Sequence, residues 1–153
     1  MKTFVFKQHK VIFSDAVIAI FENHKQILPR SHESGGIVLG QVVGNVIYIN
    51  RASTPNQFDK SSRYRFERDK NAAQILVNYE YLNSNKKITY LGEWHTHPEN
   101  VPTPSGQDRS MIKDQFKSGT LNEPFLLLVI QGIEKLYVSI YDGTILQQCH
   151  ELS

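Results

Sequence analysis

The sequence is poor in cysteine: Cys149 is the only one among its 153 residues. A disulfide within the chain is therefore excluded, Cys149 is expected to be structural, and a zinc site would need nitrogen and oxygen ligands. The sequence also lacks any apolar stretch near the ~18 residues of a membrane span. Its start, MKTFVFKQHK, lacks the apolar core of a signal peptide. We expect a cytoplasmic protein without a membrane partner.

The sequence also lacks a large excess of positive or negative residues. Seventeen Lys and Arg residues stand against fifteen Asp and Glu, which gives a formal charge of +2 and no basic run that would follow a phosphate backbone. Nucleic acid is therefore not an expected partner. A chain of this length can bury roughly two-thirds of the surface that its unfolded form exposes, so we expect a single domain over residues 1–153.

Strand-like and helix-like segments alternate along the first two-thirds of the chain, and a strand meander ends it. Strands are expected at 3–6, 11–13, 35–43, 46–52, 63–66, 86–94, 124–132, 135–141 and 144–148. Helices are expected after Ser14, over about 69–82, and from Ser105 to Gly119. This order predicts an α/β fold of three layers, a mixed sheet with helices on its faces.

The first two helices each carry an apolar stripe that should face the core. In the first helix the stripe consists of Val17, Ile20, Phe21, Ile27 and Leu28, and the helix should stop at Pro29. In the second it consists of Ala72, Ile75, Leu76, Tyr79 and Leu82. Both faces are therefore expected to be buried.

Two of the six histidines stand one residue apart in GEWHTHPENVPTPSGQD, residues 92–108. Because side chains alternate along a strand, His95 and His97 should point to one face, with Trp94 and Thr96 on the other. Two imidazoles therefore converge at the end of an apolar strand. Taken alone, a His-x-His pair is more often a pair of hydrogen-bonded side chains than a pair of metal ligands.

Three prolines follow, and Ser105 can then begin a helix whose first turn brings Asp108 back toward the strand end. Two histidines and one carboxylate suit Zn²⁺, and three protein ligands leave the fourth tetrahedral position to water, as in catalytic sites. The same Ser-x-x-Asp spacing also fits a simple helix capping box.

The complete pattern, His-[Ser/Thr]-His-Pro followed by six residues and Ser-x-x-Asp, resembles the signature of the JAMM (JAB, or MPN+) metallopeptidases. Five fixed positions occur by chance in about one in 10⁴ chains of this length. The resemblance implies the JAB/MPN fold, which is similar to the cytidine-deaminase layout. A deaminase itself is not expected, because its zinc needs a Cys-x-x-Cys pair. The histidines outside the motif are expected at the surface or in packing: His9, His24, His32 and His150.

The resemblance also implies roles. One zinc ion would be held by His95, His97 and Asp108. The family places a glutamate before a glycine-containing apolar strand, and the segment ESGGIVLG makes Glu33 the implied general base. Glu93, two residues before the first histidine, is the competing carboxylate, for which a supporting role is expected.

The Ser105 hydroxyl would, by the same resemblance, hydrogen-bond the oxyanion of the reacting amide. Its alternative role is that of the helix N-cap, and the two roles are compatible.

Members of this family cleave peptide or isopeptide bonds after the tail of ubiquitin, ubiquitin-like or sulfur-carrier proteins. The chain resembles small bacterial members encoded beside E1- and E2-like conjugating enzymes, including antiphage systems built on cyclic-oligonucleotide synthases. The expected substrate is therefore a ubiquitin-like tail or a protein conjugate, and these enzymes are the expected partners. The loop 54–64, TPNQFDKSSRY, is the segment best placed to clamp an extended tail.

Two alternatives remain open. One is a peptidase of the same type that acts on a sulfur-carrier or cell-wall peptide. The other is a non-catalytic scaffold, against which the complete ligand set argues.

Overall fold

A computed structural model describes residues 1–152 of the chain. The strands are β1 (Lys2–Phe6), β2 (His9–Phe13), β3 (Gly35–Val43), β4 (Val46–Ala52), β5 (Lys60–Ser61), β6 (Phe66–Glu67), β7 (Thr89–Thr96), β8 (Leu126–Gln131), β9 (Leu136–Tyr141), β10 (Leu146–Gln148) and β11 (His150–Glu151). The helices are α1 (Asp15–Asn23), α2 (Lys70–Asn83) and α3 (Gly106–Ser118). None of the helices within this range is long and apolar enough to cross a membrane.

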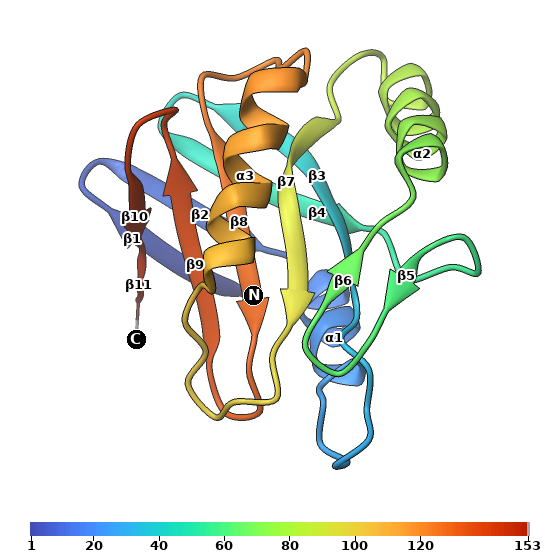
Figure 1. Ribbon diagram of the computed structural model, residues 1–153. Helices are drawn as coiled ribbons and strands as arrows, with labels where there is room; N and C mark the ends of the chain where they lie inside the picture. The colour runs from blue at the N-terminus through green and yellow to red at the C-terminus, as the bar shows by residue number, and fades with distance from the viewer. Residues whose placement is uncertain (153) are drawn as a thin grey trace.

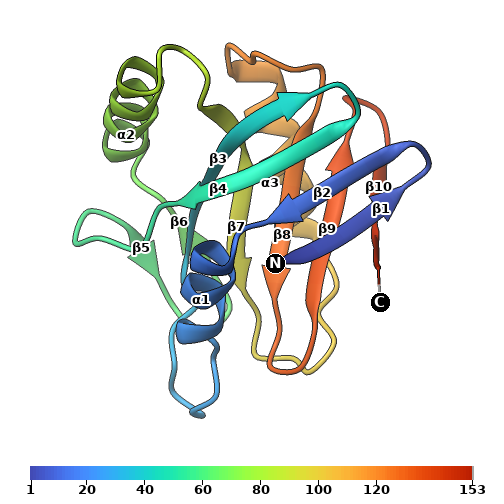
Figure 2. The ribbon, with the colours of Figure 1, turned by 180° about the vertical axis from the view of Figure 1, so that it is seen from behind.

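The main sheet is mixed, and it curls until its two edges are joined by the chain itself. Over residues 1–152 its strand order is β10-β9-β8-β7-β3-β4-β2-β1-β11. The edge strands β10 and β11 are separated only by Cys149, whose N–H donates to the carbonyl of Val138 at 2.8 Å. Strands β1, β2 and β4 consequently cross over β8 and β9 when the molecule is seen from behind (Figure 2). The C-terminal segment therefore closes the sheet into a barrel-like form.

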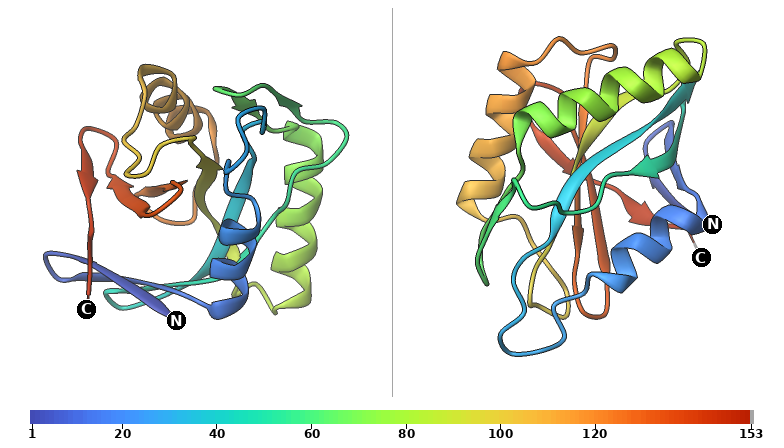
Figure 3. Two further views of the ribbon diagram at one scale, coloured as in Figure 1. Left: turned by 90° about the horizontal axis from the view of Figure 1, so that it is seen from below. Right: turned by 90° about the vertical axis from the view of Figure 1, so that its right-hand side faces the viewer.

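Helices cover both faces of this sheet, and the three-layer α/β prediction is confirmed (Figures 1 and 3). On the inner face, Phe21 of α1 packs with its ring centroid 5.9 Å from that of Phe13 and 5.0 Å from that of Trp94. On the outer face, Ile112 of α3 and Ala73 of α2 belong to two separate apolar clusters. The outer face is also the one that carries the site described below.

The predicted extent of the first helix was wrong. Helix α1 begins after the N-cap Ser14 as expected, but it ends at Asn23, and Ile27 and Leu28 are exposed. Its end is fixed by His24, whose N–H bonds the carbonyl of Phe21 at 3.2 Å. The chain then leaves the helix, and the loop that follows is bonded through Gln26 to the carbonyls of Ser31 and Arg63.

The predicted stripe of the second helix was also wrong in its register. Ile75, Tyr79 and Leu82 are 70%, 61% and 69% exposed. The buried side of α2 runs instead through Ala73, with Val77 and Leu76 packed beside it, and Leu76 is the one large member of the predicted stripe that does face the core. Apolar periodicity alone could not select between these two faces.

The shortest strands were not predicted correctly from the sequence. A strand was expected at 63–66, whereas β6 covers Phe66–Glu67 and pairs with β5, which was not expected. Strand β11 was also missed. Each has two residues, too few for an alternating pattern to be read.

Candidate metal-dependent active site

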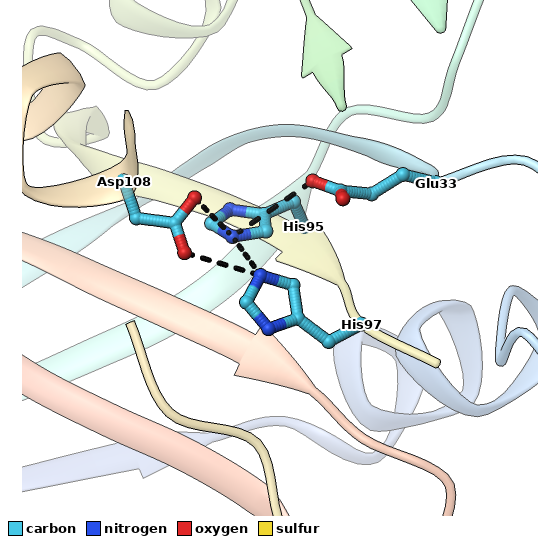
Figure 4. Close-up of side chains that lie close together, drawn as sticks. All are labelled: Glu33, His95, His97 and Asp108. Carbon is cyan, nitrogen blue, oxygen red and sulfur yellow. Dashed lines mark hydrogen bonds and ion pairs between the residues drawn. The ribbon is translucent and has the colours of Figure 1, made fainter. Parts of the chain in front are cut away.

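Strand β7, which ends at Thr96, brings His95 and, just beyond its end, His97 to the outer face of the sheet. It lies between β3 and β8, in the middle of the strand order. Trp94 points into the inner core, while the alternation of the strand turns His95 and His97 the other way, as expected. Their Nε2 atoms lie 3.2 Å apart (Figure 4). The strand therefore presents two imidazoles at one point.

The first turn of α3 brings a carboxylate to the same point. Ser105 is the N-cap: its Oγ accepts from the Asp108 N–H at 3.1 Å, and Asp108 Oδ2 accepts from the Ser105 N–H at 2.8 Å. The Asp108 carboxylate also reaches His95 Nε2 at 3.0 Å through Oδ1 and His97 Nε2 at 3.1 Å through Oδ2. The capping box thus fixes the carboxylate that faces both histidines.

Glu33 reaches the group from the segment just before β3. Its side chain is buried, and its Oε1 lies 3.9 Å from His95 Nε2. Burial raises the pKa of Glu33 to about 7, although positive charge on His95 and His97 would lower it. A carboxyl group with such a pKa can both accept and release a proton near neutral pH.

The four side chains form one buried group whose possible ligand atoms all lie within 4.8 Å of one another. Two nitrogens that bind a tetrahedral zinc ion at about 2.0–2.1 Å are about 3.3 Å apart. The observed separations of 3.2 Å between nitrogens and of 3.0 and 3.1 Å from nitrogen to carboxylate oxygen are close to this value. His95, His97 and Asp108 therefore fit a zinc ion, and Glu33 stands outside this close spacing.

The electrostatics of the group hold Asp108 in its ligand form, while the pKa of His97, which burial alone would lower, is raised above its usual value by the neighbouring carboxylates Asp108 and Glu33. Burial alone would raise the pKa of Asp108, but hydrogen bonds with His95 and His97 outweigh it, so the pKa lies well below its usual range. Asp108 is therefore ionised. On the other side, His97 Nδ1 lies 2.9 Å from Glu99 Oε1. An Nδ1–H that donates to Glu99 leaves the Nε2 lone pair directed into the cluster.

Glu93, the competing carboxylate, is not part of this group and is bonded to other residues. It forms a two-pronged ion pair with Arg68, at 2.7 Å from Nε to Oε1 and 3.1 Å from Nη2 to Oε2. Tyr90 also donates to its carboxylate, and Arg68 donates to Gln115 of α3 at 3.1 Å. Glu93 therefore holds Arg68, and with it the start of α2, against the sheet.

A groove of about 770 Å³ runs past the cluster. One wall is the segment 58–69, which includes the exposed rings of Phe58 and Tyr64, and the other is the first half of α3. Phe66 also lines the groove, and it comes close to Gly35, where a Cβ would lie 2.6 Å from the ring. The predicted clamp 54–64 thus overlaps one wall, but the wall continues to residue 69.

The remaining histidines and the cysteine lie outside the cluster. His24 packs edge-on against Trp94 and bonds the carbonyl of Ile20, and His32 bonds Ser61. Cys149 is buried between the sheet edges, and burial raises the pKa of its thiol to about 12.

Two residues around the site were not found from the sequence. Arg68 and Gln26 are isolated polar residues in the sequence, without a motif or a period that would single them out. Only the fold brings them beside Glu93 and Thr96.

The chain matches a family model described as prokaryotic homologs of the JAB domain over residues 22–141. Among curated proteins it is similar to a "CD-NTase/cGAS isopeptidase" of Pseudomonas aeruginosa, with 36% identity over 132 residues, 86% of this chain and 83% of that protein. A protein of the same name from Escherichia coli is 38% identical over 125 residues, 82% and 78% of the two chains.

More distant similarities agree with this grouping. A "Probable metalloprotease y4qB" of Sinorhizobium fredii is 27% identical over 100 residues, 64% of this chain and 61% of that protein. Among solved structures, protein DSY2949 of Desulfitobacterium hafniense superposes with a TM-score of 0.64 at 18% identity, covering 90% of this chain and 88% of that one. The latter similarity supports the fold alone.

Proposed function

The chain belongs to the prokaryotic JAB-domain family, and from this membership we propose that it is a cytoplasmic zinc-dependent isopeptidase of the JAMM type. Its substrate is a protein conjugate, cleaved at the amide bond that follows a carboxyl-terminal tail. The observation that carries the proposal is the convergence of two Nε2 atoms and one carboxylate at ligand spacing, with Glu33 Oε1 at 3.9 Å from His95 Nε2.

The substrate class is supported by the relatives, whose names describe isopeptidases for CD-NTase/cGAS proteins. We assign this chain a conjugate of a CD-NTase-type enzyme within a bacterial antiphage system, with E1- and E2-like conjugating enzymes as its functional partners. The open groove beside the cluster accommodates an extended tail, and an amide reaches a site on the sheet face most readily when its flanking backbone is straightened.

His95, His97 and Asp108 would hold the zinc ion. When bound, zinc supplies the Lewis acidity that makes water nucleophilic near neutral pH and polarises an amide carbonyl. Glu33 takes a proton from the attacking water at its carboxylate and returns it to the leaving amine nitrogen as the C–N bond breaks. Asp108 stays ionised in this scheme, and Glu99 keeps His97 in the tautomer that presents Nε2.

Ser105 contributes a second function at its hydroxyl. Its oxygen accepts the Asp108 N–H, which leaves the hydroxyl proton free to donate to the developing oxyanion. Capping and oxyanion stabilisation therefore use different parts of the same group.

The proposal is tested by mixing the protein with a CD-NTase tail peptide joined through an isopeptide bond to the ε-amine of a fluorescent lysine. Mass spectrometry should find the intact tail carboxylate and the freed lysine, and a chelator should stop the reaction. A tail from a sulfur-carrier protein and a cell-wall peptide serve as parallel substrates. If the sulfur-carrier tail or the cell-wall peptide were cleaved and the CD-NTase tail were not, the proposed substrate would be wrong. If none of the three were cleaved, the protein would be a non-catalytic scaffold.

Replacing Ser105 with glycine separates its two roles. Glycine is an adequate N-cap that costs only a few tenths of a kcal/mol, so thermal stability should change little. The hydroxyl donor is lost, however, and kcat should fall about 10²-fold. Steady-state kinetics and thermal unfolding of the variant check both. A glycine variant with wild-type kcat would restrict Ser105 to capping.

Removing the two exposed rings of the groove wall tests the substrate path. In the variant Phe58→Ala/Tyr64→Ala the fold should be unaffected, since both side chains are exposed. KM should rise several-fold, because the substrate loses apolar contacts that contribute about 1–2 kcal/mol to its binding free energy, while kcat should change much less. Ile75→Ala/Tyr79→Ala on α2 is the matched control with equally exposed side chains. An unchanged KM on the cleaved conjugate would remove this wall from the substrate path.

A further inference from the structure

Gln26 has a buried side chain that joins three segments around the site. It is 2% exposed, although it lies in the loop after α1. Its Nε2 donates to the carbonyls of Ser31 at 3.1 Å and Arg63 at 2.8 Å, and its Oε1 accepts from Thr96 Oγ1 at 2.9 Å. Both amide protons and the amide oxygen are therefore engaged.

Thr96 extends this set of bonds to the residue after Glu33. It is the last residue of β7, lies between the two histidines of the motif and is fully buried. Its hydroxyl accepts from the Ser34 N–H at 2.9 Å, and because it has one proton, that proton goes to Gln26. The direction of each bond in the chain from Ser34 to Gln26 is therefore fixed.

The hydrogen bonds of Gln26 and Thr96 hold the base loop, residues 31–34, on both sides of Glu33. Gln26 holds the carbonyl of Ser31, and Thr96 holds the N–H of Ser34. The Glu33 N–H itself donates to the carbonyl of Ser62 at 2.7 Å. Ser62 belongs to the groove segment, the wall formed by residues 58–69, and the residue after it, Arg63, is also bonded to Gln26. The base loop and one wall of the groove thus share a single anchor.

Building on the proposed function, we propose that Gln26 is a positioning residue that sets the carboxylate of Glu33 relative to the zinc ligands and couples it to the substrate-binding wall. Its amide acts through Thr96 on the base loop and through Arg63 on the groove segment. Without it, the buried hydroxyl proton of Thr96 and the carbonyls of two half-buried residues lose their partner, so both segments are expected to shift to satisfy them. A misplacement of about 1 Å in a catalytic group can cost about 10²-fold in rate.

The two links of Gln26 predict different kinetic signatures. Thr96→Val removes only the hydroxyl link to the base loop, so kcat should fall about 10–10²-fold with little change in KM. Gln26→Leu removes that link and the bond to Arg63, so kcat should fall and KM should rise. Thr96→Ser keeps the hydroxyl and should restore most of kcat. All three should retain zinc, because none changes a ligand.

Ser139→Ala is the matched control. The Ser139 hydroxyl is also fully buried and donates to a backbone carbonyl, that of Leu128 at 3.2 Å, but neither residue belongs to the cluster or to the base loop. Its loss should leave kcat and KM near wild type. If Gln26→Leu does not fold, the comparison of Thr96→Val with Thr96→Ser decides the proposal.

Amide hydrogen exchange provides a readout independent of activity. Exchange at Ser34 should be faster in Thr96→Val and Gln26→Leu than in the wild type, and exchange in residues 61–64 should be faster in Gln26→Leu alone. Unchanged exchange at Ser34, unchanged kcat, or a Thr96→Ser variant as slow as Thr96→Val would overturn the positioning role. An inactive wild type would overturn the proposed function instead, and exchange alone would then decide this inference.

Discussion

Glu33→Gln is expected to abolish most turnover while zinc stays bound at about one ion per chain. The change is nearly isosteric and leaves His95, His97 and Asp108 intact. It removes the group that takes a proton from water and returns it to the leaving amine, so kcat should fall by at least about 10²–10⁴-fold. Binding of the conjugate should remain close to wild type. Metal analysis and single-turnover kinetics on the same preparation measure both quantities.

Glu93→Gln is the internal control for this variant. Glu93 faces Arg68 and Tyr90 instead of the cluster, so most of kcat should remain. Weakening a buried bond to a charged group should cost about 1.5–3 kcal/mol of stability, so the comparison belongs at a temperature where both variants are folded. An inactive Glu93→Gln beside an active Glu33→Gln would exchange their roles. Loss of zinc from the Glu33→Gln variant would show that Glu33 is a zinc ligand.

Loss of the two histidines is expected to have the other large effect. The double variant His95→Ala/His97→Ala should bind no zinc and show no cleavage, because only one of the three proposed ligands, Asp108, remains and cannot hold the ion. The fold should survive, since both side chains lie on a sheet that is held together by its own apolar clusters. Metal analysis and circular dichroism check the two statements, and stoichiometric zinc in this variant would contradict the ligand assignment.

Asp108→Ala is expected to differ from the histidine variants in one respect. The Asp108 carboxylate also accepts the Ser105 N–H in the capping box of α3. Its loss should therefore remove zinc and, in addition, lower stability by about 1 kcal/mol through the weakened cap. Equal stability of Asp108→Ala and the histidine variants, measured without zinc, would show that the cap contributes little.

Local sequence rules were sufficient for the parts of this molecule that depend on neighbours in the chain. Strand alternation placed His95 and His97 on one face, and the Ser-x-x-Asp spacing placed Asp108 in the first turn of α3. The position of Glu33 followed from family resemblance, because its proximity to β7 depends on the pairing of β3 with β7 across about sixty residues.

Other features depend on tertiary contacts that no local pattern encodes. The exposed stripe of Ile75, Tyr79 and Leu82 has the helical period of a buried face, yet α2 buries its Ala73 side on the sheet. The role of Gln26 arises from bonds to residues as far away as Thr96. The joining of the two sheet edges at Cys149 likewise depends on the curvature of the whole sheet.

The central claim is that the cluster of Glu33, His95, His97 and Asp108 hydrolyses an isopeptide bond with the help of one zinc ion. The most direct test is to strip the protein with a chelator and to measure cleavage of the isopeptide-linked CD-NTase tail as zinc is added back. Cleavage should be absent without metal, rise in proportion to bound zinc and reach its maximum at about one ion per chain. Full cleavage by the stripped protein, or no cleavage of this tail or the parallel substrates by the zinc-loaded protein, would contradict the claim.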